Sequence, residues 1–212
     1  MMYHGSFFTS DVPGLAAHVR TLDERLAALF PELADGRAAG RLRLCPDELT
    51  GRGVSLADGY RPELGTALAL YSGHVVADWP LGDYVLSLPP FRRDGSTWHP
   101  SVDAAVRCRT RQPPLCSAAL FNHSCHDTTV SLRRPAELRD CPLSCAVAYP
   151  TAELQAGGRL LWDYDGGAAR GNAAYSMDLA GSLQLRAEGF ASVPCACRGA
   201  QPCPRQRWFR VW

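Results

Sequence analysis

Phe121-Asn122-His123-Ser124-Cys125, followed further along the chain by Trp162-Asp163-Tyr164, is the part of the sequence that decides the fold. These two segments belong to an ordered set, and the order carries more information than any single member. The other members, in chain order, are Gly51-Arg52-Gly53-Val54, Gly65-Thr66, Tyr71-Ser72-Gly73-His74-Val75, Val102-Asp103-Ala104 and finally Cys195-Ala196-Cys197 with Cys203. Because glycines lack side chains, the backbone at the Gly-x-Gly can turn tightly and approach a ligand closely.

The sequence around these segments predicts many short strands. Apolar runs occur at residues 42–44, 67–71, 75–76, 84–88 and 128–132. Turn signals separate them, among them Gly51-Arg52-Gly53, Asp58-Gly59 and Pro89-Pro90. This spacing favours several small sheets over repeated βαβ units. We expect loops at 94–100 and 107–114, a strand within 102–106, and a flexible insertion at the glycine- and alanine-rich residues 166–171.

Residues 10–34 are predicted to form a helix. Ser10 or Asp11 can cap it and Pro13 is tolerated in its first turn, while Pro31 and Gly36 end it. One apolar face of this helix consists of Leu15, Val19, Leu22, Leu26 and Leu29. We expect that face to pack against the rest of the domain; a helix that binds a partner is the alternative.

Composition bounds the class of protein. A chain of 212 residues can form one domain with elaborations, and 46% hydrophobic with 20% charged residues is ordinary for a globular protein. The net charge of +1 provides no general attraction to nucleic acid or to a membrane surface. No apolar run reaches the roughly 18 residues of a membrane span, and the N-terminus lacks the pattern of a secretory signal. We therefore expect neither nucleic-acid nor membrane binding, and a reducing compartment.

The nine cysteines point towards metal binding or burial rather than disulfides. Cys195-x-Cys197-x5-Cys203 offers three thiolates in a short span, one ligand short of a tetrahedral zinc site. The remaining candidates for a second site, Cys108, Cys116, Cys141 and Cys145, have irregular spacing. Buried free cysteines are common, so we expect no second metal site.

The ordered set resembles the SET-domain lysine methyltransferases over residues 45–212. The resemblance implies a mainly β (α+β) fold of several small sheets, with a threaded C-terminal segment that brings Asn122-His123 and Asp163-Tyr164 together. A helix is added at the N-terminus. The corresponding division is an N-terminal helical extension at 1–40, a SET domain at 41–190 and a post-SET-like zinc-binding tail at 191–212.

The resemblance also implies S-adenosylmethionine as the methyl donor. Gly51, Arg52, Gly53 and Val54 match the family's loop along the donor, and Asn122 and His123 match positions that hold its adenine and amino-acid ends. Buried Asn and His side chains offer paired hydrogen-bond donors and acceptors, which suits a polar cofactor. For each residue alone an ordinary role remains open: a plain turn for the glycine segment, and a satisfied buried pair for Asn122 and His123.

Tyr164 matches the family's catalytic tyrosine, and Tyr71 matches an aromatic residue beside the lysine channel. Methyl transfer needs a neutral amine aligned with the sulfonium methyl group, and a phenol can hold that geometry. Aromatic walls suit both the aliphatic lysine stem and the cationic sulfur. Trp162 is interpreted as a core residue.

In the family the fourth zinc ligand comes from the cysteine of Asn-His-Ser-Cys. The implied Zn2+ ligands are therefore Cys125, Cys195, Cys197 and Cys203. Such a site would pin the tail over the active site and contribute to its folding. Four free cysteines in a loose tail are the alternative. Trp208, Phe209 and Trp212 could cover the site or pack on the core.

Several positions depart from the family pattern. Asp127-Thr128 replaces a usual Pro-Asn, Gly158-Arg159 replaces paired acidic residues, and Ala119-Leu120 replaces an Arg-Phe pair. The gap between Cys197 and Cys203 is longer than usual, and no cysteine-rich segment precedes residue 45.

The predicted function is that of an S-adenosylmethionine-dependent protein-lysine N-methyltransferase. Its expected partner is a protein substrate, a histone or another lysine-bearing tail. Its expected location by resemblance is the nucleus, with the cytoplasm as the alternative. Two alternatives remain open at this point. One is a catalytically silent SET-like module that binds a peptide or the cofactor. The other is a zinc-stabilised interaction protein that uses the helix at 10–34. The sequence leaves the target lysine, the methylation state and the oligomeric state open.

Overall fold

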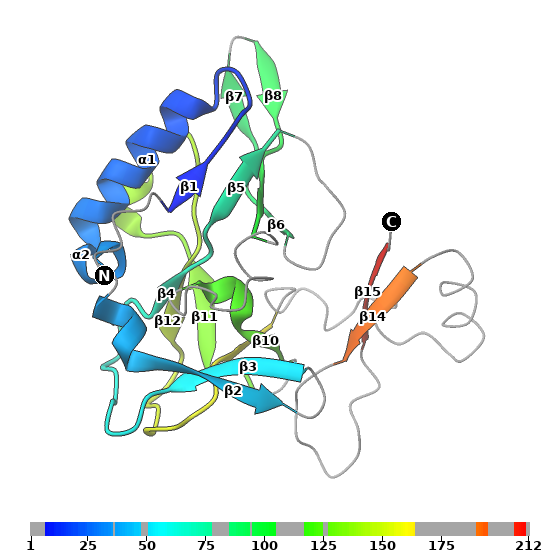
Figure 1. The fold of residues 1–212 in the computed structure, drawn as a ribbon. Helices are drawn as coiled ribbons and strands as arrows, with labels where there is room; N and C mark the ends of the chain where they lie inside the picture. The colour runs from blue at the N-terminus through cyan, green and yellow to red at the C-terminus, as the bar shows by residue number, and fades with distance from the viewer. Residues whose placement is uncertain are drawn as a thin grey trace.

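The computed structural model describes residues 7–35, 37–47, 51–77, 85–93, 95–104, 117–124, 127–163, 190–194 and 206–210. Within these ranges the chain is mainly β, with several small sheets and a helix near the N-terminus (Figure 1). The predicted fold class is confirmed in these terms. Threading of the C-terminal segment concerns residues after Asp163 and stays a prediction.

The elements have the following bounds. The helices are α1 (Ala16–Leu29), α2 (Pro31–Ala34) and the 3-10 helices η1 (Arg37–Arg41), η2 (Ala118–Leu120) and η3 (Ala136–Leu138). The strands are β1 (Phe8–Thr9), β2 (Leu42–Asp47), β3 (Gly51–Leu56), β4 (Ala69–Leu70), β5 (Gly73–Val76), β6 (Val85–Ser87), β7 (Phe91–Arg93), β8 (Ser96–Trp98), β9 (Ser101–Asp103), β10 (Asn122–His123), β11 (Val130–Arg133), β12 (Val147–Pro150), β13 (Leu161–Trp162), β14 (Phe190–Pro194) and β15 (Gln206–Arg210).

The strands form small sheets. One sheet has the order β1-β5-β9-β6 and another the order β11-β12-β4, while β2–β3, β7–β8, β10–β13 and β14–β15 are two-stranded. The pairs β1–β5 and β10–β13 are parallel. Each apolar run predicted to be a strand overlaps one, and the run at 102–106 corresponds to β9. None of the helices in the described ranges has the length and hydropathy of a membrane span.

Two predictions about loops and turns are wrong. Gly51-Arg52-Gly53 lies within β3, which pairs with β2 from Asp47 opposite Gly51 to Leu42 opposite Leu56. The loop predicted at 94–100 contains β8, which forms a hairpin with β7 around Gly95 at φ 78°. The Asp94-Gly95 dipeptide is a strong hairpin signal, because a tight turn between strands requires positive φ.

The predicted helix begins later than expected. α1 starts at Ala16, and its N-cap residue Leu15 makes no side-chain capping hydrogen bond. The Ser10 hydroxyl is used elsewhere: it donates to the Val75 carbonyl at 2.7 Å and accepts from the Val12 amide at 3.2 Å. Pro31 does not end the helical region but opens α2, which is compatible with proline in a first helical turn.

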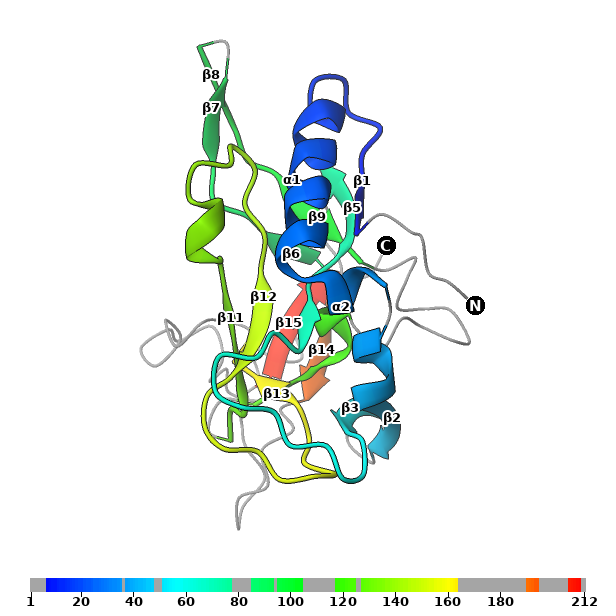
Figure 2. The ribbon, with the colours of Figure 1, turned by 90° about the vertical axis from the view of Figure 1, so that its left-hand side faces the viewer.

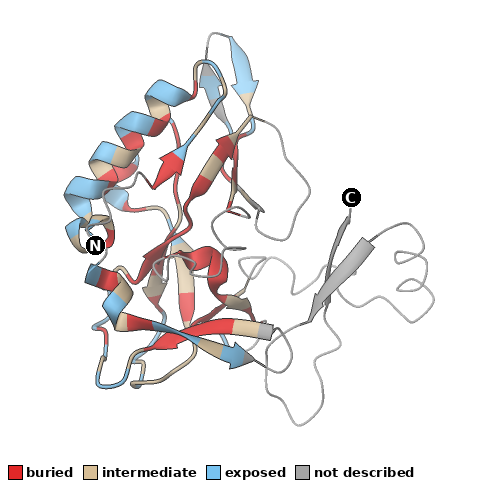
Figure 3. Cartoon of the chain, in the orientation of Figure 1, coloured by how far each residue is buried: buried red, intermediate tan, exposed pale blue. Residues whose placement is uncertain are grey.

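The apolar face of α1 is correctly predicted except at its end. Leu15, Val19, Leu22 and Leu26 are buried, whereas Leu29 is 37% exposed. The chain changes direction after Leu29, and Leu33 of α2 is buried instead. Figure 3 shows the inner side of α1 buried and its outer side exposed. The helix therefore packs on the domain, as expected.

A continuous core joins the helix to the sheets. Leu22 of α1, Val75 of β5, Val102 of β9 and Val147 of β12 are fully buried in one cluster. Figure 2 shows α1 lying alongside β1 and β5. The N-terminal segment thus shares the core of the strands, and the domain boundaries at 40 and 190 stay a prediction.

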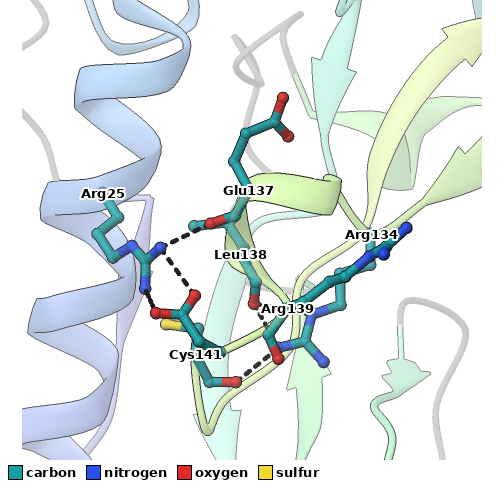
Figure 4. Close-up of polar contacts among 7 residues, drawn as sticks. Arg25, Arg134, Glu137, Leu138, Arg139 and Cys141 are labelled. Atoms are coloured by element: carbon teal, nitrogen blue, oxygen red, sulfur yellow. Dashed lines mark hydrogen bonds and ion pairs between the residues drawn. The ribbon is translucent and has the colours of Figure 1, made fainter.

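Arg25 ties the outer part of α1 to the loop around η3 (Figure 4). Its guanidinium makes two contacts with the Asp140 carboxylate, at 3.0 and 2.9 Å, and donates to the Glu137 carbonyl at 2.6 Å. The hydrogen bond and the charge of Arg25 lower the pKa of Asp140. The Asp140 side chain is exposed and the Arg25 side chain is partly exposed, so solvent screens the pair and its contribution is small.

Arg134 holds the same loop through hydrogen bonds to its backbone carbonyls. Its guanidinium donates to the carbonyls of Leu138 at 3.1 and 2.5 Å, of Arg139 at 3.2 Å and of Cys141 at 2.5 Å (Figure 4). Leu138 and Cys141 are buried, so water cannot easily replace the lost donor. The planar fork of an arginine serves several carbonyls at once, which a lysine ammonium does less well.

Arg134→Met is expected to lower the free energy of unfolding by about 2 kcal/mol, because buried carbonyls lose a charged donor. Urea denaturation measures it. Arg139→Met, which removes the same charge from an exposed side chain, is the matched control and should stay within about 0.5 kcal/mol of the wild type. Equal effects of the two substitutions would contradict this role of Arg134.

Gly73 lies where β5 passes close to β9. A Cβ atom at this position would lie 2.3 Å from the carbonyl oxygen of Asp103 and 2.9 Å from Cα of Ala104. Both atoms belong to the backbone, in β9 and in the residue directly after it, so no side-chain rotation can relieve the overlap. Glycine is required here by the close approach of two strands.

Gly73→Ala is expected to destabilise the protein by about 2–3 kcal/mol, because β5 and β9 must separate. Gly40→Ala is the control, since no atom lies within 4 Å of its added Cβ. Chemical denaturation of both variants should show a large loss for the first and little change for the second. If the Gly73→Ala protein were as stable as the control, β9 could move away from β5 without loss of folding free energy, which would contradict the prediction.

Candidate functional site

The two segments that decide the fold lie side by side in the structure. β10 and β13 are parallel partners, with Asn122 opposite Leu161 and His123 opposite Trp162. The Ser124 amide continues the pairing by donating to the Trp162 carbonyl at 3.1 Å. This pairing brings Asp163 next to His123, and Tyr164 is the following residue of the chain.

β3 joins the same assembly through residues 158–160, directly before β13. The Leu160 amide donates to the Val54 carbonyl at 2.9 Å, and the Leu56 amide donates to the Gly158 carbonyl at 2.9 Å. Ser55 and Arg159 form an isolated antiparallel bridge between these contacts. Figure 2 shows β3 and β13 together in the lower part of the molecule. The structure therefore brings together the Gly-x-Gly strand, Asn122-His123 and the segment that ends in Asp163.

Asn122 makes direct contact with the Gly-x-Gly strand. Its side-chain amide donates to the carbonyl of Arg52 at 3.2 Å. A Cβ atom on Gly53 would lie 2.6 Å from that amide nitrogen, closer than such contacts occur. Gly53 thus leaves room for the Asn122 amide inside a paired strand, which explains the second glycine of the Gly-x-Gly without a turn.

His123 and Asp163 form the charged part of the site. The His123 side chain is 3% exposed and the Asp163 side chain 15% exposed, with 3.9 Å between Nδ1 and Oδ1. This distance exceeds that of a direct hydrogen bond. Sequence reasoning named His123 but gave Asp163 no role of its own; its place just before Tyr164 was the available signal.

Tyr71 borders this assembly. Its side chain is buried, and its ring meets the Trp162 ring edge-on at 6.3 Å between centroids with 75° between planes. Edge-to-face contacts of this kind are favourable because the ring edge is positive and the face negative. Trp162 is itself buried, which confirms its interpretation as a core residue. Tyr164 lies outside the described residues.

The predicted zinc ligands Cys125, Cys195, Cys197 and Cys203 also lie outside the described residues. β14 and β15 on either side of the tail cysteines are described and pair antiparallel, with Pro194 opposite Gln206. The three tail cysteines therefore belong to the connection between two paired strands. Trp208 and Phe209 fall in β15, and Trp212 lies outside the described residues.

Cys141 and Cys145 are buried free thiols. Burial raises the pKa of Cys145 to about 12, with the charge of Arg134 acting in the opposite direction. A thiol with that pKa stays protonated at neutral pH and is a poor metal ligand or nucleophile. Among the residues that the structure describes, no three His, Cys, Asp or Glu side chains are grouped to hold a metal. Cys108 and Cys116 lie outside those residues.

Comparisons with known proteins give matches only at the level of structure. No family model matches the chain, and no curated protein matches it. The crystal structure of ATXR5 in complex with mono-methylated histone H3.1 matches with 14% identity and a TM-score of 0.45, covering 73% of this chain and 67% of that one. The ATXR5 SET domain in complex with di-methylated histone H3 matches with 15% identity and a TM-score of 0.45, covering 73% and 68%.

A third solved structure, CpSET8 from Cryptosporidium, matches with 13% identity and a TM-score of 0.40. The match covers 58% of this chain and 56% of that one. The chain is thus similar to solved SET-domain structures, and at these values the similarity carries no information about activity or substrate. Those depend on the site residues themselves.

Gly53→Ala is expected to destabilise the protein by about 1–2 kcal/mol, because the new methyl group displaces the Asn122 amide. The same substitution in an Asn122→Ala background should cost much less, since the obstructing amide is gone. A double-mutant cycle measured by denaturation should therefore give a coupling of about 1 kcal/mol or more. Additive effects would show that the two positions do not compete for space.

Proposed function

We propose that this chain is an S-adenosylmethionine-dependent protein-lysine N-methyltransferase of the SET type, acting on a histone or another lysine-bearing tail. One observation carries the proposal: β3, β10 and β13 bring Gly51–Val54, Asn122-His123 and Asp163 into one assembly. The family resemblance assigns these segments to a single site, although they are far apart in the sequence.

The residues on the donor side fit a polar, cationic cofactor. The main chain of β3, the Asn122 amide and the buried His123 imidazole offer the mixture of donors and acceptors that adenine and an amino-acid group require. S-adenosylmethionine would supply the activated methyl group when bound. The buried ring of Tyr71 supports binding of a positively charged sulfonium, because aromatic faces attract cations.

On the substrate side, the assigned task is to hold one amine in line with the donor. Only the neutral amine is a nucleophile, so the site must desolvate the lysine end and align it. Tyr164 follows Asp163 directly and is assigned the role of positioning that amine through its phenol. Tyr71 is assigned to the channel wall, where its ring can contact the aliphatic lysine stem.

Zinc and location belong to the proposal as well. Cys125, Cys195, Cys197 and Cys203 would hold Zn2+ as four thiolates, the ligand set of closed structural zinc sites. The pairing of β14 with β15 supports this, since it brings together the two ends of the connection that carries the tail cysteines. A histone substrate would place the protein in the nucleus.

A silent SET-like module that binds a peptide or the donor without turnover is the second candidate. The contact between the Asn122 amide and the Arg52 carbonyl favours it, because an amide assigned to the donor is engaged within the protein. For activity, either main-chain groups must serve the donor or Asn122 must exchange partners when the donor binds. Activity and donor binding measured together separate the two candidates.

The decisive experiment is methyl transfer from labelled S-adenosylmethionine by the zinc-replete chain to core histones and to a cell lysate. All 22 Lys or Arg positions of the chain are arginine, so label recovered on lysine comes from the substrate. Tyr164→Phe should reduce transfer by about 10²-fold or more without unfolding the protein, because it removes one hydroxyl at the reacting centre. Circular dichroism checks the fold.

Label on a lysine that is lost in Tyr164→Phe supports the enzyme and identifies its substrate. Donor binding by calorimetry with no transfer to any substrate favours the silent module. A folded wild-type protein that neither binds the donor nor transfers label would contradict both candidates and leave the interaction protein.

A further inference from the structure

β13 places Asp163 in the site, yet its own pairing is short. The strand has two residues and a single parallel partner, β10, within the described chain. Directly before it, Gly158 and Leu160 bond to β3 on the same edge of the segment at which the Trp162 carbonyl bonds to Ser124. The backbone groups of Arg159 and Leu161 that face away from β3 need other partners, because Leu160 and Leu161 are buried from solvent.

Thr129 supplies those partners. Its backbone amide donates to the Leu161 carbonyl at 2.8 Å. Its hydroxyl accepts from the Leu161 amide at 2.8 Å and lies 2.9 Å from the Arg159 carbonyl. Thr129 alone therefore contacts three backbone groups of this segment: the amide and carbonyl of Leu161 and the carbonyl of Arg159.

The Thr129 hydroxyl can make both of its contacts with its single proton. A threonine hydroxyl has one donor and two acceptor positions. The proton points best to the Arg159 carbonyl, since the Leu161 carbonyl is 3.4 Å from Oγ1 and already accepts from the Thr129 amide. An acceptor position then remains for the Leu161 amide. Neither valine nor alanine can reproduce this double role.

Thr129 is itself anchored by the residue that directly follows β12. Its carbonyl accepts from the Thr151 amide at 3.0 Å, and the Thr151 hydroxyl donates to the Thr128 carbonyl at 3.1 Å. Before it, the Asp127 amide donates to the Ser124 hydroxyl at 2.9 Å. This is the stretch in which Asp127-Thr128 replaces the Pro-Asn of the family pattern. The Ser124 and Thr151 hydroxyls bond to the backbone of residues 127–128, and the Thr129 hydroxyl bonds in turn to β13.

We propose that Thr129 is a positioning residue: its hydroxyl fixes the 159–161 backbone, and thereby the placement of Asp163 against His123 and of the chain entering Tyr164. The inference rests on the proposed methyltransferase function. It deepens that function by naming a group that contacts neither donor nor substrate but sets the geometry of those that do. Catalysis is sensitive to such geometry, since small displacements of reacting groups reduce rates strongly.

The test compares Thr129→Val, which keeps the shape but removes the hydroxyl, with Thr129→Ser, which keeps the hydroxyl. Thr97→Val is the matched control, because it removes an exposed threonine hydroxyl from β8, a strand that pairs with β7 and not with β13. The full chain, loaded with zinc, is used throughout. Amide hydrogen exchange gives a readout that needs no activity, and steady-state methyl transfer to the identified substrate gives the functional one.

Thr129→Val should speed exchange of the Leu161 amide by about tenfold or more, while the Leu160 amide, bonded to Val54, changes little. It should lower kcat by about tenfold at a temperature where the protein is fully folded, with the KM for the substrate nearly unchanged. Thr129→Ser should recover most of kcat. Thr97→Val should resemble the wild type in both readouts.

Two results would overturn the proposal. Unchanged exchange at Leu161 in Thr129→Val would show that the hydroxyl does not hold this segment. Faster exchange with a wild-type kcat would show that Thr129 contributes stability alone. Failure of the proposed function is seen separately, in a wild-type protein that neither binds the donor nor transfers methyl groups, and the positioning role would fall with it.

Discussion

The structure depends on one short interaction, the parallel pairing of Asn122-His123 with Leu161-Trp162. Parallel partners must come from separated parts of a chain, and here the pairing joins two segments that the whole β11–β12 hairpin separates. A pair of this length is weak by itself. Its neighbours hold it: β3 on one side through Val54 and Leu56, and Thr129 on the other. Every candidate side chain in the described residues is placed relative to this pair.

The remainder of the fold keeps that assembly in place. The leucines of α1 complete a core that also contains Val75 and Val147, so helix and sheets are stabilised together. Arg134 gathers the carbonyls at the turn between β11 and β12, and Arg25 fastens α1 to the same turn (Figure 4). These contacts lie away from the candidate site. They act on it indirectly, because β11 follows Thr129 in the chain and the turn sets how β11 and β12 pair.

The glycines illustrate how far sequence reasoning reaches. Gly53 belongs to the predicted Gly-x-Gly motif, but the prediction of a turn at this position is wrong, because the glycine makes room for the Asn122 amide. Gly73 likewise belongs to a chosen segment, and its reason is the backbone of β9. In both cases a side chain is excluded by an atom of a residue far away in the sequence. Local preference predicts a glycine's flexibility but not which distant group occupies the space beside it.

The sequence by itself determined the apolar face of α1, the positions of the short strands, the mainly β class and the identity of the segments that meet in the candidate site. These are properties of neighbouring residues, of their periodicity and of the order of motifs. Only the tertiary structure decided that β3 bonds to the segment before β13, that the Asn122 amide lies against Gly53, and that Thr129 completes the partners of β13. The physical reason is that β-strands satisfy their backbone groups with partners distant in the chain, so no local pattern specifies which partner each group finds.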